Sequence, residues 1–177
     1  MKISIPPYVH SWPAPAVLVG CGTVAKPNLI TIAWFGTVCS EPPHITISVR
    51  PSRFSFDLIK LSGEFTVNIP TVEQLNAVKL CGEKSGRHID KFKELGWTPR
   101  LCPPLVAAPM VEECFLSLGC KVKHILPLGT HHSFISEVVC VYIEESLIRH
   151  QRRPDPKPES QLVWLDTKYW QLNKLDK

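Results

Sequence analysis

Prolines recur along the whole chain and limit the length that any helix can reach. Seventeen of the 177 residues are proline, about twice the usual share of roughly 5%. A proline inside a helix removes a backbone hydrogen bond and costs about 3 kcal/mol. The prolines therefore divide the chain into short segments, and a helical bundle is disfavoured.

Between the prolines, apolar and polar residues alternate with the period of a β-strand. The alternation is clearest over Ile45–Val49 and Glu64–Ile69, where every second side chain would share one face. Strands are predicted over Ala16–Cys21, Leu29–Val38, Ile45–Val49, Glu64–Ile69, Cys114–Ile125 and Ser133–Ile143. Pro127-Leu128-Gly129 predicts an antiparallel hairpin between the last two. The pattern favours a mainly β fold with short helices (α+β), an antiparallel β-barrel with helical excursions.

Three short helices are predicted from their end signals. The first covers Phe54 to Leu61, with Ser52 as N-cap and Gly63 just past its end. The second begins at Thr71, whose spacing to Gln74 is that of a capping box, and stops before Gly82. The third contains Ile89, Phe92 and Leu95 and is closed by Gly96.

The length fits one domain over residues 1–177. Residues 151–160 contain three prolines and predict an extended, exposed loop, whereas residues 161–177 regain apolar character and are expected to dock on the body or on a partner. No apolar run reaches the ~20 residues of a membrane span, and no Lys/Arg-rich run predicts nucleic-acid binding. The net charge of +4 is spread along the chain.

The seven cysteines follow no metal-binding or redox motif. Their number is odd, and no C-x-x-C is present. The beginning of the chain lacks the apolar segment of a secretory signal. We therefore expect a reduced, cytoplasmic protein in which most cysteines are small core residues. The pair His131-His132 has no third ligand in the pattern and is interpreted as exposed turn histidines.

Gly20-Cys21-Gly22-Thr23-Val24-Ala25 matches the G-x-G-x-x-A fingerprint of dinucleotide-binding proteins. That fingerprint requires a helix that begins at the second glycine. Pro27 and Asn28 follow almost at once, so the glycines are interpreted as the end of a bulged strand.

Arg50-Pro51-Ser52-Arg53-Phe54-Ser55 is the better candidate for a ligand site. It joins a predicted strand to a helix N-terminus, where free N–H groups and the helix dipole favour an anion. Arg50 and Arg53 add guanidinium groups, and Ser52 and Ser55 add hydroxyls suited to phosphate. The alternative is a simple helix cap flanked by solvated arginines.

Small or polar residues also alternate on three predicted strands. These are Thr31 with Ala33, Ser48 with Arg50, and Thr66 with Asn68, bordered by Trp34. Such a surface would suit a flat heteroaromatic ring, but the solvated face of an antiparallel sheet alternates in the same way. Ser85 to Phe92 places Ser, Gly and basic residues at another helix start, either as a second anion contact or as a capped surface helix.

Several ordered blocks resemble the flavin reductase-like family of FMN-binding split β-barrels, in its flavoredoxin branch. The blocks are residues 28–34, 42–43, 48–55, 63–70 and 81–92, with weaker similarity at 112–114, 129–131 and 169–170. The resemblance covers nearly the whole chain in the same order. It is this resemblance that favours FMN over other phosphorylated ligands.

The resemblance implies a homodimer that binds FMN near its interface. Thr31, Ala33 and Trp34 would line the isoalloxazine ring, and Arg50, Ser52, Arg53 and Ser55 would hold the ribityl chain and phosphate. Ser85, Gly86, Arg87 and Lys91, from the same or the other subunit, would close the site. The predicted FMN-binding set is Asn28, Thr31, Ala33, Trp34, Ser48, Arg50, Ser52, Arg53, Ser55, Asn68, Ser85, Gly86, Arg87 and Lys91.

The function implied is that of an oxidoreductase that passes reducing equivalents from NADH or NADPH to flavin, with no residue required as general acid or nucleophile. Lys91 or Arg50 would stabilise negative charge on the reduced flavin. Two alternatives stay open: a flavoredoxin-like electron carrier with protein redox partners, and a non-enzymatic ligand-binding barrel. No metal, nucleic-acid or membrane partner is expected.

Overall fold

The computed structural model describes residues 2–9, 12–149, 153–154 and 161–173. The strands are β1 (Ala14–Pro15), β2 (Val17–Thr23), β3 (Lys26–Ile32), β4 (Phe35–Ser40), β5 (Pro43–Val49), β6 (Glu64–Ile69), β7 (Pro99–Leu101), β8 (Pro109–Val111), β9 (Leu116–Pro127), β10 (His132–Ile143), β11 (Ile148–Arg149), β12 (Arg153–Pro154), β13 (Leu162–Leu165) and β14 (Lys168–Gln171). The helices are α1 (Phe54–Ser62), α2 (Leu75–Glu83) and α3 (Lys91–Leu95), with short 3-10 turns η1 (Val72–Gln74) and η2 (Glu145–Leu147).

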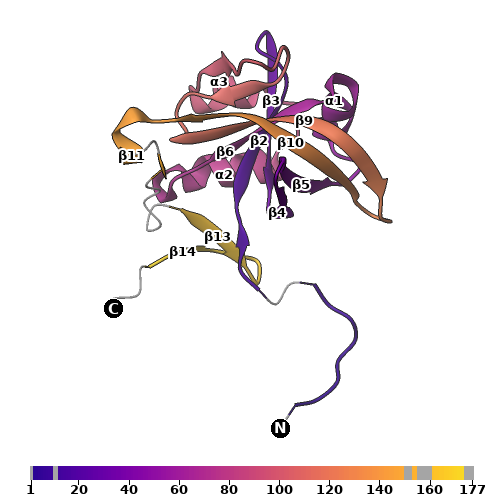
Figure 1. Cartoon of the computed structure of the whole chain (residues 1–177). Helices are drawn as coiled ribbons and strands as arrows, with labels where there is room; N and C mark the ends of the chain where they lie inside the picture. Colours follow the sequence, from indigo (N-terminus) through magenta and orange to yellow (C-terminus); the bar gives the residue numbers. More distant parts are fainter. Residues whose placement is uncertain (1, 10–11, 150–152, 155–160, 174–177) are drawn as a thin grey trace.

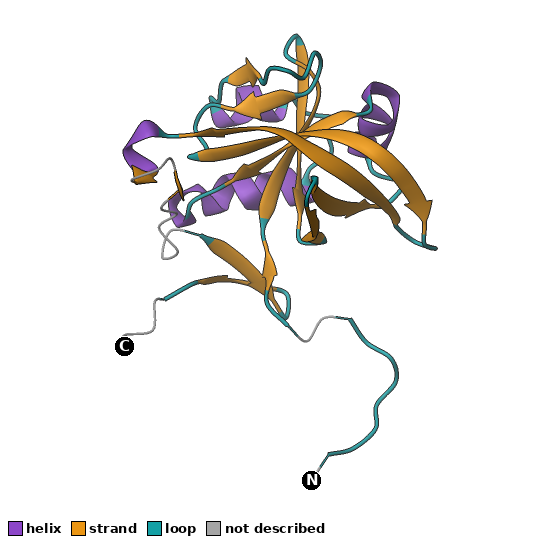
Figure 2. Ribbon diagram, viewed as in Figure 1, coloured by secondary structure: helices purple, strands orange, loops and turns teal. Residues whose placement is uncertain are grey.

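A seven-stranded antiparallel sheet dominates the molecule (Figures 1 and 2). Its strand order is β3-β2-β6-β9-β10-β5-β4. The predicted hairpin is confirmed, since β9 and β10 pair antiparallel along most of their length. The mainly β, antiparallel fold with short helices is also confirmed. Within the described residues, β3 and β4 form two edges of this sheet, so it does not close into a complete barrel.

The predicted single strand over Leu29–Val38 is wrong. The chain leaves β3 after Ile32 and enters β4 at Phe35, at the opposite edge of the sheet. Ala33 and Trp34 make this crossing, and the Trp34 carbonyl oxygen accepts a hydrogen bond of 2.9 Å from the Ser48 backbone N–H of β5. Propensity alone does not report the break, because the residues on both sides of it favour strands.

The helix ends agree with the sequence where the signal is a glycine. Gly63 and Gly96 end α1 and α3 in the left-handed conformation, with φ of 66° and 64°. Ser52 is not the cap of α1, because Arg53 occupies that position without a side-chain cap bond.

The second helical segment differs from its prediction at its end. The capping box of Thr71 and Gln74 is present and opens the 3-10 turn η1, after which α2 begins. The helix passes through Gly82 instead of stopping before it. A Cβ on Gly82 would lie 3.4 Å from the Thr31 Cβ, in ordinary van der Waals contact, so α2 lies against β3 at this position.

Residues 162–171 form a hairpin of two strands, β13 and β14. β13 pairs with both β1 and β14 in a small sheet, which lies next to α2 in Figure 1. Leu162 and Val163 of β13 are buried. Of the predicted loop over residues 151–160, only Arg153–Pro154 lies within the described residues, where it pairs with β11.

Three apolar clusters occupy the interior. One joins the large sheet to α1 through Phe56 and Ile59, and a second joins β2 and β3 to α2, α3 and β13. A third, smaller cluster contains Cys102, Leu105, Ala108 and Met110. Five of the seven cysteines are buried, as predicted for core residues. Among the described residues, no helix has the length and apolar character needed to cross a membrane.

The Gly20-x-Gly22 motif lies at the end of a strand, as interpreted, but no bulge is present there, because β2 pairs with β3 in continuous register. β2 leads directly into β3, and Gly22 adopts a φ of 87° at the turn. A Cβ on Gly20 would collide with the Pro109 carbonyl oxygen and the Thr66 hydroxyl. Both glycines therefore serve backbone geometry and close packing.

We predict that Gly20→Ala lowers the free energy of unfolding by about 1–3 kcal/mol, because the added methyl group would collide with the Pro109 carbonyl oxygen and the Thr66 hydroxyl. Urea unfolding measures the loss. Gly36→Ala in β4 is the matched control, since a Cβ there meets no atom within 4 Å, and its stability should equal or slightly exceed that of the original protein. Equal losses in both variants would contradict the packing argument.

Candidate functional site

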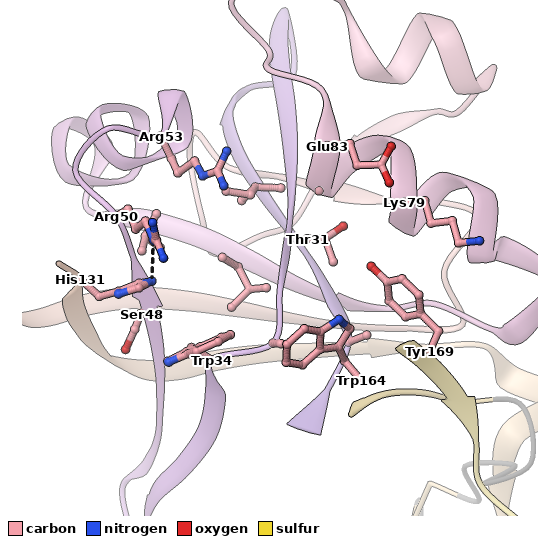
Figure 3. Close-up of a pocket in the computed structure, with 16 residues that line it drawn as sticks. Thr31, Trp34, Ser48, Arg50, Arg53, Lys79, Glu83, His131, Trp164 and Tyr169 are labelled. Atoms are coloured by element: carbon pink, nitrogen blue, oxygen red, sulfur yellow. Dashed lines mark hydrogen bonds between the residues drawn. The ribbon is translucent and has the colours of Figure 1, made fainter. Parts of the chain in front are cut away.

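A cavity of about 370 Å³ lies where the chain crosses between the sheet edges. β3, β5, the β13–β14 hairpin with Trp164 and Tyr169, and one face of α2 surround it (Figure 3). The predicted residues that line it are Thr31, Ala33, Trp34, Ser48, Arg50 and Arg53. Its volume falls within the range of about 300–1,000 Å³ that small-molecule sites occupy.

We call this space the larger cavity, because a smaller one adjoins it. One end of the larger cavity is basic. Arg50 and Arg53 lie at this end in Figure 3, beside His131 from the loop between β9 and β10. The Arg50 Nε–H donates to the His131 Nε2 at 3.3 Å. The His131 ring lies nearly parallel to the Trp34 ring, with centroids 5.7 Å apart and an interplanar angle of 6°.

This network assigns the tautomer of His131. Because Nε2 accepts from Arg50, the ring proton resides on Nδ1, which lies 3.0 Å from the Thr130 hydroxyl oxygen. Burial lowers the pKa of His131, and the positive charges of Arg50 and then Arg53 lower it further. The interpretation of His131 as an exposed turn residue is therefore wrong: it is half-buried and bonded at the site.

The other end of the larger cavity carries different chemistry. Lys79 and Glu83 extend from one face of α2, and Tyr169 reaches toward Thr31 from β14 (Figure 3). The Thr31 hydroxyl donates to the Val78 carbonyl oxygen at 2.5 Å, which fixes its orientation. Burial, and next the charge of Glu83, raise the pKa of Tyr169, so its hydroxyl keeps its proton at neutral pH.

A smaller cavity of about 230 Å³ adjoins the larger one. The two share Ile30, Arg53 and Gly82 in their linings. The predicted residues that line the smaller cavity are Ser52, Arg53, Ser55, Ser85, Gly86, Arg87 and Lys91. Lys84 and His88 add to its basic character, and no carboxylate of the described residues lines it. One chain thus supplies both predicted groups, Ser52–Ser55 and Ser85–Lys91.

The Ser55 hydroxyl is held in place from behind by Asn28. The Asn28 Nδ2 donates to the Ser55 Oγ at 2.8 Å. Burial raises the pKa of the neighbouring Cys21 thiol, and hydrogen bonds from Asn28 and Ser55 oppose that rise. The buried Asn28 Oδ1 has no hydrogen-bond partner among the described residues. A Cβ on Gly86 would collide with this oxygen and approach the Phe54 ring to 2.9 Å. Glycine therefore allows the backbone at position 86 to lie against the Asn28 side chain and the Phe54 ring.

Arg87 links the two sides of the smaller cavity. Its Nη1 donates to the Ser52 carbonyl oxygen at 3.2 Å, and its guanidinium lies 5.5 Å from the centroid of the Phe54 ring. The Arg87 backbone N–H donates to the Ser85 hydroxyl at 3.3 Å. These contacts hold the turn at residues 85–87 against the start of α1, where helix N–H groups favour an anion.

Lys91 is buried, and its ammonium group is hydrogen-bonded to backbone carbonyl oxygens. Its Nζ donates to the carbonyl oxygens of Leu29 at 2.6 Å and Cys81 at 2.8 Å. Burial lowers the pKa of Lys91. It lines the smaller cavity and not the larger one, so of the two cations predicted beside a reduced ring, only Arg50 lies at the aromatic walls.

Asn68 does not lie at either cavity, contrary to the prediction. It is fully buried on β6, which β2 separates from β3. Its amide donates to the Leu18 carbonyl oxygen and accepts from the Val111 N–H and the Ser117 hydroxyl. Alternation predicted its face correctly but could not show that β8 covers that face.

Sequence reasoning missed several lining residues. These are Lys79, Glu83, Lys84, His131, Trp164 and Tyr169. Lys79 and Glu83 sit four residues apart on α2, a spacing that places them on one helix face. Trp164 and Tyr169 fall in the segment predicted to dock on the body, so their apolar character was the available signal.

A third, uncharged hollow of about 550 Å³ lies beside the larger cavity. The two share Trp34 and Trp164, whose ring centroids are 6.1 Å apart, and Ser48. The tryptophans thus lie between a charged and an uncharged space. Among the described residues, no His/Cys/Asp/Glu cluster could hold a metal ion.

The model of the flavin reductase like domain matches residues 9–173. The chain belongs to the flavin reductase-like family. It superimposes on flavoredoxin of Desulfovibrio vulgaris (Miyazaki F) with a TM-score of 0.89 and 30% identity, covering 100% of this chain and 96% of the other.

Two further family members extend the comparison. The FMN reductase (NADH) RutF of Pseudomonas syringae is 28% identical over 162 residues, which are 85% of this chain and 82% of the relative. A putative flavin reductase with split barrel domain from Shewanella frigidimarina has a TM-score of 0.81 at 21% identity, covering 93% of this chain and 85% of that one. The open, antiparallel sheet thus has the split-barrel fold that the family resemblance implied.

We predict that Arg50→Gln raises the pKa of His131 toward the ordinary value of about 6.5, because one of the neighbouring positive charges is removed. In the original protein, folding favours the neutral form of His131. The contribution of His131 to the free energy of unfolding is therefore fully present above its ordinary pKa and is lost as the pH falls through its lowered pKa. NMR titration of the His131 ring, without added nucleotide, measures the shift.

Arg100→Gln is the control for this titration. Arg100 lies outside both cavities and pairs with Glu112 on the surface, so its removal should leave the His131 titration unchanged. An unchanged pKa in Arg50→Gln would contradict a contribution of the Arg50 charge to the lowered pKa of His131.

Proposed function

We propose that the chain is an FMN-binding oxidoreductase that passes reducing equivalents from NADH or NADPH to the flavin. The observation that carries this proposal is the pair of adjoining cavities that share Arg53. One is lined by cations and hydroxyls, and the other has aromatic walls. FMN has the same division, with a phosphate at one end and a flat ring at the other.

The smaller cavity fits the phosphate end. Arg53, Lys84 and Arg87 supply positive charge there, and Ser52, Ser55 and Ser85 supply hydroxyls. Charge-assisted hydrogen bonds from such groups to phosphate are about twice as strong as neutral ones. The start of α1 adds backbone N–H donors.

The larger cavity fits the ring end. Trp34 and Trp164 provide flat apolar walls, and the hydroxyls of Thr31 and Ser48 lie along its lining. A bound flavin accepts a hydride or single electrons and passes them on. Arg50 supplies a fixed positive charge at this cavity, which would stabilise negative charge on a reduced ring.

The electron donor is proposed by analogy with the relatives. The Pseudomonas syringae relative is named an FMN reductase that uses NADH. Among the described residues, the larger cavity is open at the surface beside Trp34, whose side chain is 39% exposed. A donor can therefore approach the proposed ring position from solvent.

A second candidate is an electron carrier that keeps its FMN and exchanges electrons with protein partners. The match to flavoredoxin over the entire chain favours it. A protein that takes up no flavin would instead be a non-enzymatic ligand-binding barrel. The expectations of a homodimer with FMN near the interface, of a protein redox partner and of a cytoplasmic location stay predictions.

We predict that Arg53→Ala weakens FMN binding roughly 10- to 100-fold, the loss expected for one or two charge-assisted hydrogen bonds. The thermal midpoint of the flavin-free protein should change by less than about 2 °C, because Arg53 makes no side-chain cap bond. Quenching of FMN fluorescence measures the affinity, with Arg100→Ala as the surface control. Parallel losses of affinity and stability would contradict a phosphate-binding role.

Addition of NADH or NADPH to the anaerobic, FMN-loaded protein tests the reaction. We expect rapid bleaching of the flavin absorbance, faster than for free FMN with the same nucleotide. Bleaching by a reduced redox protein but not by either nucleotide would favour the carrier. A colourless protein that takes up no FMN would overturn both flavin functions.

A further inference from the structure

Two cysteine sulfurs meet outside the cavities described above. Cys102 follows β7, and Cys140 lies in β10. Their Sγ atoms are 3.5 Å apart, and neither residue lines the larger, smaller or uncharged space. We propose that Cys102 and Cys140 are a peroxide-oxidisable pair that forms a reversible disulfide.

Gly119 provides the room in which the sulfurs meet. It pairs with Cys140 across β9 and β10, just after the irregular register between Val138 and Cys140. A Cβ at Gly119 would collide with the Cys140 Sγ and lie 3.0 Å from the Cys102 Sγ. Glycine at this position therefore leaves room for the two sulfurs to lie side by side over β9.

The loop that carries Cys102 is held against the sheet. The Tyr142 hydroxyl of β10 donates to the Pro103 carbonyl oxygen at 3.0 Å. The Glu64 carboxylate of β6 accepts from the backbone N–H groups of Val106 at 3.0 Å and Ala107 at 2.9 Å. A disulfide has an S–S length of about 2.05 Å, so closure requires an approach of roughly 1.5 Å. The anchored loop keeps Cys102 within that reach.

The two cysteines differ in exposure, and this difference assigns their roles. Cys140 is partly exposed, whereas Cys102 has an exposed fraction of 0%. Burial raises the pKa of Cys102, with further contributions from Cys140 and Glu64, so Cys102 stays a thiol at neutral pH. Cys140 is therefore the sulfur that an oxidant reaches first, and Cys102 is the resolving thiol.

The chemistry balances with hydrogen peroxide as the oxidant. The Cys140 sulfur attacks one peroxide oxygen, which gives a sulfenic acid and releases one water. The Cys102 sulfur then attacks the Cys140 sulfur, which forms the S–S bond and releases a second water. Two thiols are oxidised by two electrons in total, and one peroxide is reduced to two waters. A dithiol reductant reverses the bond.

The other cysteines lack this arrangement. Cys39 is exposed and its thiol donates to the Glu41 carbonyl oxygen at 3.3 Å. The remaining ones are buried, and within the described residues no other two cysteine sulfurs are in hydrogen-bonding contact. Cys39 thus serves as an unpaired reference thiol in the same molecule.

The test treats the full reduced chain with hydrogen peroxide, blocks free thiols by alkylation and digests with trypsin. Cleavage after Arg100, Lys121, Lys123 and Arg149 separates residues 101–121 from residues 124–149. We expect these two peptides to be joined by a bond that a dithiol removes. Fragmentation should place the bond at Cys102, and not at Cys114 or Cys120 of the same peptide.

Matched variants distinguish the roles. Cys39→Ser should form the bond as the original protein does, and Cys140→Ser should not form it. Cys102→Ser should stop at a sulfenic acid on Cys140, which dimedone captures. If Cys102→Ser does not fold, the cross-link in the original protein and its loss in Cys140→Ser still decide.

The thermal midpoint provides a second readout, because a cross-link between residues 102 and 140 restricts the unfolded chain. It should rise on oxidation by roughly 5–10 °C, and only where Cys102 and Cys140 are both present. FMN affinity should not change, since neither sulfur lines the cavities.

Peroxide doses that oxidise Cys39 without joining the two peptides would overturn the proposal, as would a bond that uses another cysteine. These outcomes do not depend on flavin binding. A failure here would leave the proposed function standing, and a protein that bound no flavin could still form the bond.

Discussion

The hydrogen bond from the Ser48 N–H to the Trp34 carbonyl oxygen holds the chain crossing at Ala33 and Trp34, on which the site depends. It secures the point where the chain leaves one edge of the large sheet and joins the other. In the sheet order, four strands lie between β3, which carries Thr31, and β5, which ends just before Arg50. The crossing brings β3 and β5 to the same cavity, so the break in the predicted strand is what creates the site.

The fold also concentrates charge that the sequence spreads out. The net charge of +4 gave no reason to expect an anion, yet Arg53, Lys84, Arg87 and Lys91 all line one small cavity. Such like charges repel one another, and their proximity is tolerated because two of them are engaged by carbonyl oxygens: Arg87 by Ser52, and Lys91 by Leu29 and Cys81. The same bonds tie α2 and the turn at residues 85–87 to the sheet and to α1.

The sequence predicted best what is decided locally. Gly63, Gly96 and the Thr71–Gln74 capping box depend on residues within one turn, and each is present. Asn68 failed as a site residue because alternation gives a face of a strand and not what covers it; here β8 and Ser117 use its amide. The candidate anion-binding segment after β5 was found because its hydrogen-bond donors are consecutive in the sequence. His131 and Tyr169 were missed because they reach the cavity from distant parts of the chain.

The open edge of the sheet explains why a polar cavity can persist in so small a protein. Burying polar groups such as the Thr31 and Ser48 hydroxyls and the Arg50 guanidinium away from water costs free energy unless they are hydrogen-bonded. Here the gap is instead lined by groups that satisfy one another: His131 accepts from Arg50 and stacks on Trp34, and Thr31 donates to Val78. These contacts hold the walls apart and oriented before any ligand arrives, which reduces the ordering cost of binding. The strand break that defeats pattern-based prediction is therefore the same feature that makes the fold suited to hold a flat, phosphorylated molecule.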